Sequence, residues 1–380
     1  MAATVGIAGC SGGSGGGDSG GSDGGSGGTD DGGSGGTVTD SSGPELVPIN
    51  VGLVGGSYGE AQAAAYIDTW NEEHDVEITN VSRPGVGEII AEMQAAGDPS
   101  SMGWSVAHSN SVANYQGAIN DLWAPLQPDD FQNFDNLERL VPTEASYEPN
   151  PDEAFHHLPM NYGANGLAWN TELMDEPAGW GDLLRDDLQG QISLPVWVND
   201  AVARNAIAQG MEINNINENY EEKVSQIFDR VSRENDYVAT WFSSGAEMEE
   251  LVTNETAWTG VLWYGRVLNR QSEGVPLDYK LPEEGTDAWV DTWQVPAGLD
   301  EDRLYTAKRF LDWTMRPENV QILTENIAYG TAVEVPNPPE SYNQNPDIEA
   351  FDQGLIDVWD PSVIEEHQDD WQIRFEEATS

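Results

Sequence analysis

The apolar and polar positions of this chain follow two different periods. Short apolar runs closed by glycine or proline predict strands, and apolar residues three or four positions apart predict amphipathic helices. The predicted strands span residues 49–56, 76–81, 166–170, 191–197, 257–263 and 288–296. The predicted helices span residues 60–74, 85–97, 200–211, 220–235 and 303–315, with a helical turn at 179–184 and a further helix opened by Pro317. This alternation indicates an α/β fold with parallel sheets.

The first 45 residues lack that pattern. Residues 11–45 are mostly glycine, serine, aspartate and threonine, which is typical of a disordered, flexible tether. Ahead of it, residues 7–10 (Ile-Ala-Gly-Cys) are similar to a lipobox, where a signal peptide is cut and the cysteine is lipidated. The run lacks a basic start, so we expect the true start upstream. We interpret 1–10 as a signal-peptide remnant ending in the lipidation site Cys10, and 46–380 as the folded body. A free thiol in a disordered tail is the alternative.

The net charge of the chain indicates the environment of the protein more than the nature of its ligand. The chain has 67 acidic residues against 15 basic ones, a net charge of −52. This argues against binding of nucleic acid or anionic lipid through a basic patch. The composition resembles that of proteins from extreme halophiles, in whose molar salt the screening length is about 3 Å. Only direct contacts in a site would then select a ligand.

One motif suggests hydrolysis. Residues 55–59 read G-x-S-x-G between a predicted strand and a predicted helix, which is the context of a hydrolase nucleophile at Ser57. However, the tether repeats the pattern at residues 12–16, and no folded loop precedes the motif to complete an oxyanion hole. The triad histidine would have to be His367, in a polar C-terminal stretch. A serine hydrolase stays as an alternative.

Other motifs are less specific. Two glycosylation sequons begin at Asn80 and Asn254, and they matter only if the body is outside the cell. His156 and His157 are adjacent, so on a strand they would point to opposite faces. We therefore expect no metal site and no cofactor.

Aromatic residues and carboxylates gather at the ends of predicted elements. Trp289 and Asp291 lie two apart on one strand face, and Trp263 ends another strand. Tyr329 follows a helix, and Asp200 opens one. Ligands of open α/β sheets bind beyond the carboxyl ends of strands. The face of an aromatic ring contributes about 2 kcal/mol to the binding of a desolvated organic cation, and a carboxylate adds a charge-assisted hydrogen bond. Alternatively, the tryptophans are core residues and Asp200 only caps its helix.

A resemblance to a known family starts from these residues. Residues 288–333 carry a Trp-x-Asp strand, a Pro-Ala turn, a helix, Arg-Pro-Glu and a Tyr-Gly-Thr turn. This run resembles the C-terminal segment of the spermidine/putrescine-binding family of ABC-transporter solute receptors. Residues 55–78 and 179–207 resemble other segments of that family, and the similarity runs over most of residues 50–335.

The resemblance implies a type II periplasmic-binding-protein fold, in which two α/β lobes close by a hinge on a ligand in the cleft between them. Lobe 1 would comprise about 46–157 and 290–380, and lobe 2 about 158–289, with chain crossings near 157–162 and 286–291. The match to ligand contacts of the family covers Asp200, Trp263, Trp289, Asp291 and Tyr329, and more loosely Gln372. Tyr58 would form a wall of the first lobe.

This chain also departs from the family. Ala203 stands where the family has a second carboxylate, with Arg204 beside it, and Arg266 follows a predicted strand. Within residues 109–115, the family has an aromatic residue at a position where this chain has none, and Tyr115 would have to substitute for it. The lost anion and the added cations leave open a monoamine, a zwitterion, an anion or a ferric complex.

Together, these patterns predict an extracellular, cell-surface lipoprotein anchored to the cytoplasmic membrane through Cys10. It would act as a monomer that delivers a small solute, a polyamine or related organic amine, to the permease and ATPase of an ABC importer, and it would not be an enzyme. The alternatives are the Ser57 hydrolase, a binding protein for a ferric complex, thiamine, an amino acid or a phosphonate, and a structural surface lipoprotein without a ligand.

Overall fold

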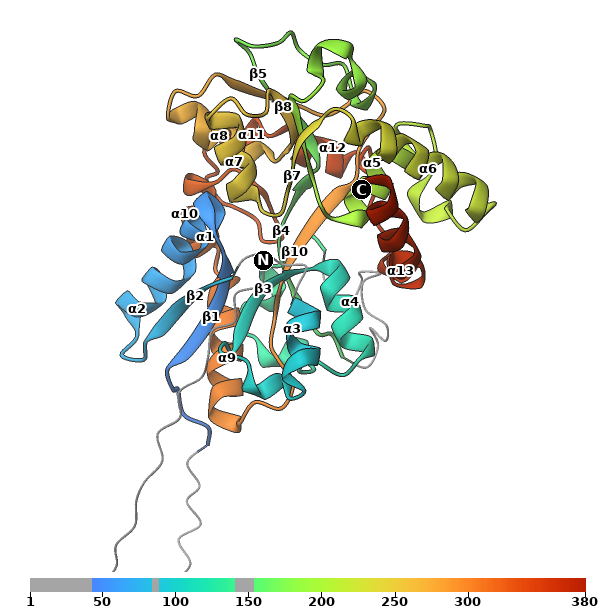
Figure 1. Ribbon diagram of the computed structural model, residues 1–380. Coiled ribbons are helices and arrows are strands. Elements are labelled where there is room, and N and C mark those ends of the chain that lie inside the picture. Colours follow the sequence, from blue (N-terminus) through green and yellow to red (C-terminus); the bar gives the residue numbers. More distant parts are fainter. Residues whose placement is uncertain (1–42, 84–88, 141–153) are drawn as a thin grey trace, which may run out of the picture. The chain divides into compact units, whose positions relative to one another are not determined.

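Two β-sheets organise the folded body (Figure 1). A computed structural model describes residues 43–83, 89–140 and 154–380, and Gly43–Ser380 forms one unit. The strand order is β11-β4-β10-β3-β1-β2 in one sheet and β7-β6-β8-β5-β9 in the other. Each sheet has its own hydrophobic core. We call each sheet with the helices packed on it the first lobe and the second lobe.

The first lobe combines parallel and antiparallel strands. β1 pairs in parallel with β2 and β3, while β10 runs antiparallel to β3 and β4. The strands of this sheet are β1 (Ile49–Val54), β2 (Ile78–Arg83), β3 (Val106–Asn110), β4 (Leu158–Ala164), β10 (Ala288–Gln294) and β11 (Gly330–Thr331). Its helices include α3 (Ile89–Ala96), α4 (Ser111–Ile119), α9 (Glu301–Thr314), α10 (Pro317–Asn326), α11 (Glu340–Asn343) and α12 (Pro346–Asp352). Pro317 is the first helical residue of α10, as predicted.

The first helix of this lobe starts earlier than residue 60. It runs through α1 (Gly56–Gln62), a π-helical segment η1 (Ala63–Asp68) and α2 (Thr69–Glu73). Gly56 has a φ of +75°, a conformation that favours glycine. The chain can therefore turn directly from β1 into α1, and this turn places Tyr58 in the first helical turn at the carboxyl end of β1.

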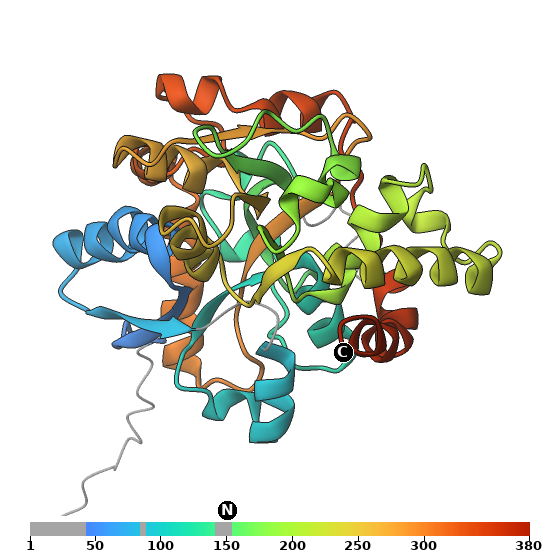
Figure 2. The same ribbon diagram turned by 45° about the horizontal axis from the view of Figure 1, so that its top comes forward.

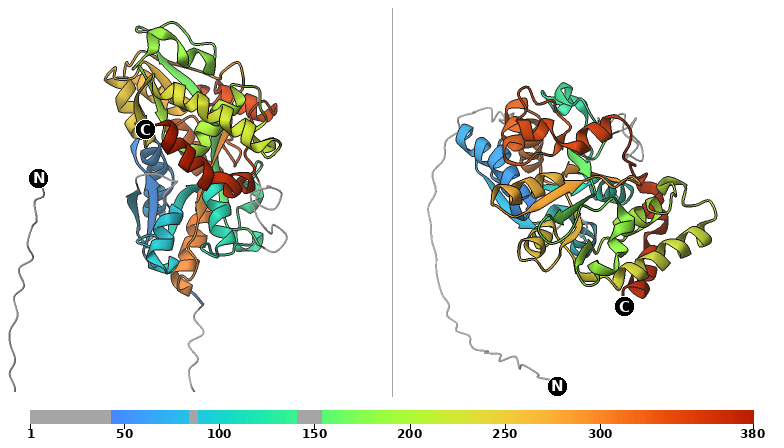
Figure 3. Two further views of the ribbon diagram at one scale, coloured as in Figure 1. Left: turned by 45° about the vertical axis from the view of Figure 1, so that its right-hand side comes forward. Right: turned by 90° about the horizontal axis from the view of Figure 1, so that it is seen from above.

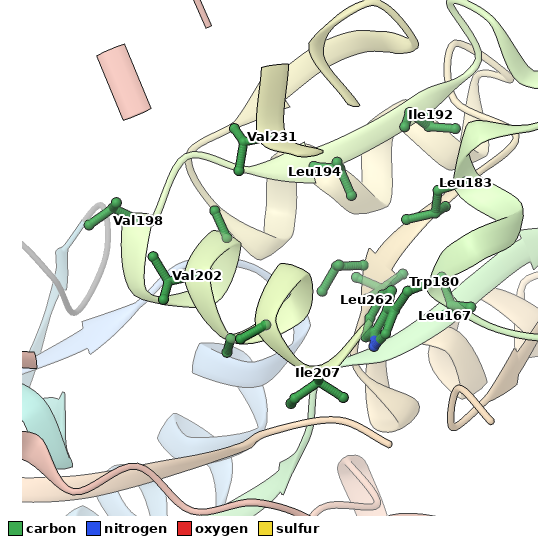
Figure 4. Packing of buried hydrophobic residues seen from close by; sticks show 14 of the residues in the cluster. Leu167, Trp180, Leu183, Ile192, Leu194, Val198, Val202, Ile207, Val231 and Leu262 are labelled. Carbon is green, nitrogen blue, oxygen red and sulfur yellow. The ribbon is translucent and has the colours of Figure 1, made fainter. Parts of the chain in front are cut away.

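The second lobe contains the elements predicted within residues 166–263, together with others that were not predicted. Its strands are β5 (Gly166–Asn170), β6 (Ile192–Pro195), β7 (Val238–Phe242), β8 (Thr259–Leu262) and β9 (Leu277–Lys280). Its helices are α5 (Val198–Ile207), α6 (Tyr220–Asn235), α7 (Gly245–Thr253) and α8 (Tyr264–Ser272), with a helical turn at Trp180–Leu184. Strands β7 and β9 and helices α7 and α8 were not predicted. Leu194, Val202 and Leu262 pack with Trp180 in its core (Figure 4). The bounds of α6 are those that the apolar spacing predicts.

The chain first crosses between the lobes at two places that lie side by side, and it crosses again after residue 352, before its C-terminal helix. β4 ends at Ala164 and β5 begins at Gly166, so the first crossing is at Asn165. The second spans residues 281–287, between β9 and β10. The backbone N–H of Asn165 donates to the carbonyl of Asp287 (3.1 Å), which joins the two segments. β4 and β10 then run paired through the middle of the body (Figures 1 and 2). The first crossing lies just after the expected 157–162, and the second mostly before 286–291.

The C-terminal helix differs from the expected lobe division, which assigns residues 290–380 to the first lobe. α13 (Pro361–Ala378) packs against α5 and α6, and its buried Trp371 and Phe375 join the second core (Figures 1 and 3). The carboxylate of Asp360 accepts the N–H of Ser362, which starts the helix. We therefore propose that α13 belongs to the second lobe. None of the helices in the described part of the chain is long and apolar enough to cross a membrane.

Candidate functional site

A cavity of about 720 Å³ opens where the two lobes face each other. Residues at the carboxyl ends of β1 and β3 line it from the first lobe, and residues that follow β6, β7 and β8 line it from the second. Strand β10, α13 and the two crossings complete the wall. This is the position at which open α/β sheets bind ligands, since the loops after the strands converge there.

The structure brings every predicted site residue to this cavity. The lining includes Tyr58, Asp200, Trp263, Trp289, Asp291, Tyr329 and Gln372. Gln372 lies at the exposed rim, where its amide donates to Glu376 (3.0 Å). Tyr115 does not line the cavity, and α4 contributes Gln116 instead. Contact of these side chains with a ligand stays a prediction.

Three aromatic rings form one wall. Trp289 and Tyr58 both meet Tyr329 edge-on, with ring centroids 4.8 and 4.9 Å apart. The indole packs over the backbone of Gly163, where a Cβ atom would lie 2.7 Å from the ring. Burial and the charge of Asp291 raise the pKa of Tyr58 well above its usual value, so its hydroxyl stays neutral. Trp289 is partly exposed, and its Nε1 has no hydrogen-bond partner. Trp289 therefore packs against the first-lobe core and also lines the cavity.

A second aromatic wall comes from the second lobe. Trp197 and Trp263 have ring centroids 6.1 Å apart, and both line the cavity. Trp263 Nε1 donates to Oδ1 of Asn165 (3.0 Å), which ties this wall to the first crossing. Trp197 is missing from the predicted site residues, although it ends a predicted strand as Trp263 does. The signal was the same: an aromatic residue at the carboxyl end of a strand.

Asp291 already has a partner in the first lobe. Its Oδ2 lies 2.9 Å from Nε2 of His108, a buried residue of β3. The other ring nitrogen of His108 lies 3.1 Å from Oε1 of Gln62. Nothing in the sequence pairs His108 with Asp291, because the pairing depends on the antiparallel alignment of β3 and β10. The pair places one carboxylate and one imidazole at this end of the cavity.

The arginines that weakened the case for a cationic ligand are balanced by carboxylates. Arg204 does not line the cavity, and its Nη2 lies 2.7 Å from Oε2 of buried Glu234. Arg266 lines it but pairs with Glu249, which also contacts Arg270 (3.0 Å). The second arginine that lines the cavity, Arg83, forms an ion pair with Glu92 (3.2 Å) and lies over the ring of Trp104.

Apart from the exposed Asp369, two carboxylates of the cavity have no such partner in the described part of the chain. Asp200 is the third residue of α5, and Trp197 occupies the cap position, so the interpretation of Asp200 as a helix cap is wrong. Its Oδ1 accepts from the amide of Asn199 (2.9 Å). Asp287 is buried at the second crossing and was not predicted. Burial raises the pKa of Asp200 to about 7 and, with the charge of Asp200, raises the pKa of Asp287 well above its usual value.

Ser57 lies outside this cavity. Its hydroxyl donates to Oε1 of Glu249 (3.1 Å), so it contacts a carboxylate that is already paired with arginines. His367, the candidate triad histidine, stacks on Tyr220 and forms a hydrogen bond with Asn217. The structure therefore does not bring the two residues of the proposed triad together.

The sequence matches known solute-binding proteins. Residues 65–350 match the family described as bacterial extracellular solute-binding protein. The spermidine/putrescine-binding periplasmic protein 1 of Haemophilus influenzae is 27% identical over 184 residues, 47% of this chain and 48% of that protein. The spermidine/putrescine-binding periplasmic protein of Salmonella typhimurium is 24% identical over 247 residues, 62% and 67% of the two chains. The chain thus spans about half the length of the first of these relatives.

Solved structures share the fold. The binding protein AgtB from A. tumefaciens R10, in complex with agropinic acid, has a TM-score of 0.71 at 18% identity and covers 88% of this chain and 99% of its own. The substrate-binding protein PotD of a spermidine/putrescine ABC transporter from Streptococcus pneumoniae has a TM-score of 0.67 at 15% identity, covering 88% and 100%. The predicted fold of two α/β lobes is therefore confirmed.

Proposed function

Because the chain belongs to the bacterial extracellular solute-binding proteins, we propose that it is the receptor that delivers a polyamine or a related organic amine to an ABC importer. One observation carries the choice of an amine. The arginines of the cavity are paired with carboxylates, whereas Asp200 and Asp287 have no cationic partner in the described segments. A cavity with unbalanced carboxylates and aromatic walls suits an organic cation.

Transport requires that ligand binding change the conformation of the receptor. The cavity takes walls from both lobes, so a bound amine would contact both and favour the closed arrangement of the hinge. Trp289 and Tyr329 would cover the carbon chain from one side, and Trp263 with Trp197 from the other. The closed form would then be the one that the permease and ATPase of the importer recognise.

A ligand panel tests this function directly. We expect spermidine or putrescine to raise the thermal midpoint of the protein in molar KCl, the condition that the acidic composition favours. A ligand at 100 times its Kd adds roughly 2.7 kcal/mol to the free energy of unfolding. Amino acids, thiamine, phosphonates and ferric chelates complete the panel. Stabilisation by one of these, with none by any amine, would replace the amine as the proposed solute.

The variant Ser57→Ala separates the receptor from the hydrolase. We expect it to bind the amine within a few-fold of the wild-type Kd, because Ser57 lies outside the cavity and its hydroxyl donates to Glu249. Ester hydrolysis by the wild type that disappears in this variant would support the hydrolase instead. Calorimetric titration and a chromogenic ester assay on the same preparations give both readouts.

We further propose that Cys10 carries a lipid that anchors the receptor to the outer face of the cytoplasmic membrane. Cys10 and the tether lie outside the described residues, so this proposal rests on the lipobox-like run and on the family. Asn80 and Asn254, the sequon asparagines, are exposed in the structure. An intact mass of the protein extracted from its native membrane would reveal the lipid and any glycan, and a mass without the lipid would refute the anchor.

A further inference from the structure

Asp287 is an unusual residue to find at a hinge. It is 2% exposed, and among the described residues Oδ2 has no hydrogen-bond partner. Oδ1 accepts from the amide of Asn165 (3.1 Å), the residue of the first crossing. Leaving a buried carboxylate oxygen without a partner is unfavourable, so such a group calls for an explanation.

The cavity supplies that explanation, because Asp287 and Asp200 both line it. The first comes from the crossing before β10 and the second from the start of α5 in the second lobe. We propose that these two carboxylates together hold one primary ammonium group of the ligand, with Asp287 as a specificity-determining residue. This inference rests on the proposed function of an amine receptor. The resemblance to the polyamine-binding family implies Asp200 as a contact but assigns nothing to Asp287.

The chemistry of the pair selects the kind of amine. A primary ammonium has three N–H donors and can serve both carboxylates at once, whereas a quaternary ammonium has none. Asn165 joins the pair to the aromatic wall, since its Oδ1 accepts from Trp263 and its Nδ2 donates to Asp287. The carbon chain that follows the ammonium would therefore lie beside the indole of Trp263.

The charges around the pair favour uptake of a cation. Arg204 is the nearest base on α5, but its charge is matched by Glu234. The backbone of Asp357 pairs with that of Asp287 and brings another acid, and further along β10 Asp291 faces His108. With the raised pKa values of Asp200 and Asp287, the empty pair retains a proton near neutral pH. The ligand ammonium replaces that proton, which passes to the buffer.

Two measurements with putrescine test the pair. Titration calorimetry of the wild type at pH 7 in buffers of different ionisation enthalpy should show release of a proton on binding. Below pH 7 the Kd should rise as pH falls, by up to about tenfold per unit, because protons compete with the ligand. Asp287→Asn should weaken binding at least about tenfold and reduce the proton release. Asp200 still supplies one carboxylate in that variant, so binding should not vanish.

Controls separate this inference from the proposed function. Asp278→Asn removes an exposed carboxylate of β9 outside the cavity and should bind as the wild type does. Choline, which lacks N–H donors, should not compete with putrescine. If the wild type binds putrescine without releasing a proton, or if Asp287→Asn folds and binds equally well, the inference fails while the amine receptor stands. If the wild type binds no amine of the panel, both fail.

Discussion

Replacement of Glu234 by glutamine is expected to lower the free energy of unfolding by about 3–5 kcal/mol. Glu234 is fully buried and accepts Arg204 Nη2 (2.7 Å) and the amide of Asn205 (3.1 Å), with Arg230 Nε at 3.9 Å. Without its charge, the Arg204 guanidinium remains in the second-lobe core with no balancing anion. Chemical denaturation in molar KCl, compared with the wild type, measures the loss.

The same helix offers a matched control for this variant. Glu222→Gln removes an exposed carboxylate of α6 and should change stability by no more than about 0.5 kcal/mol. Replacing both partners, Arg204→Met with Glu234→Leu, should recover part of the stability, since the charge of Arg204 is then removed with that of Glu234, while Arg230 still loses its contact with Glu234. A loss in Glu234→Gln as small as that of Glu222→Gln would contradict the role of this pair. Its folded fraction should bind putrescine more weakly, because the charge of Arg204 acts on Asp200 and Asp287 and is then no longer matched by Glu234.

Arg204 illustrates what the sequence could not provide. Its position beside Ala203 suggested a cation in the site, but α5 turns the side chain toward α6, where Glu234 balances it. That pairing depends on how two helices pack, and no local pattern encodes it. The same holds for His108 and Asp291, which meet only because β3 and β10 are adjacent antiparallel strands.

Local sequence patterns predicted the structure correctly where the place of a residue in its strand or helix also fixes its place in the fold. Alternation of strand and helix gave the α/β class, and the apolar spacing gave the bounds of α6. Trp263 and Trp289 were recognised because ligands of such sheets bind beyond strand ends. Asp287 was missed because it precedes β10 in a crossing, where no periodicity marks which side chains turn inward. Helix α13 was missed because its buried Trp371 and Phe375 stand among many charged residues.

Replacement of Asp291 by asparagine is expected to raise the Kd for putrescine roughly 100-fold or more, the largest change among the site variants. Truncating one partner of a buried charge pair in a binding site costs about 2–5 kcal/mol. Asp291 is 9% exposed, and its Oδ2 faces His108 (2.9 Å). The asparagine would leave both the imidazole and the ligand ammonium without an anion. Titration calorimetry in molar KCl measures the change, and Asp68→Asn, an exposed residue of η1, is the control.

Comparison with Asp287→Asn distinguishes the role of Asp291 from that of the pair formed by Asp200 and Asp287. Asp287 shares its proposed ammonium with Asp200, so its loss is partly compensated, whereas the ionisable groups that act on Asp291 in the described cavity include His108 and the neutral Tyr58, neither of which is an anion. The Asp291 variant should therefore weaken binding more than the Asp287 variant and leave proton release near pH 7 unchanged, because the protonated pair lies elsewhere. Equal affinity of Asp291→Asn and the wild type would remove Asp291 from the site. Loss of proton release in that variant would instead mean that the three carboxylates titrate as one cluster.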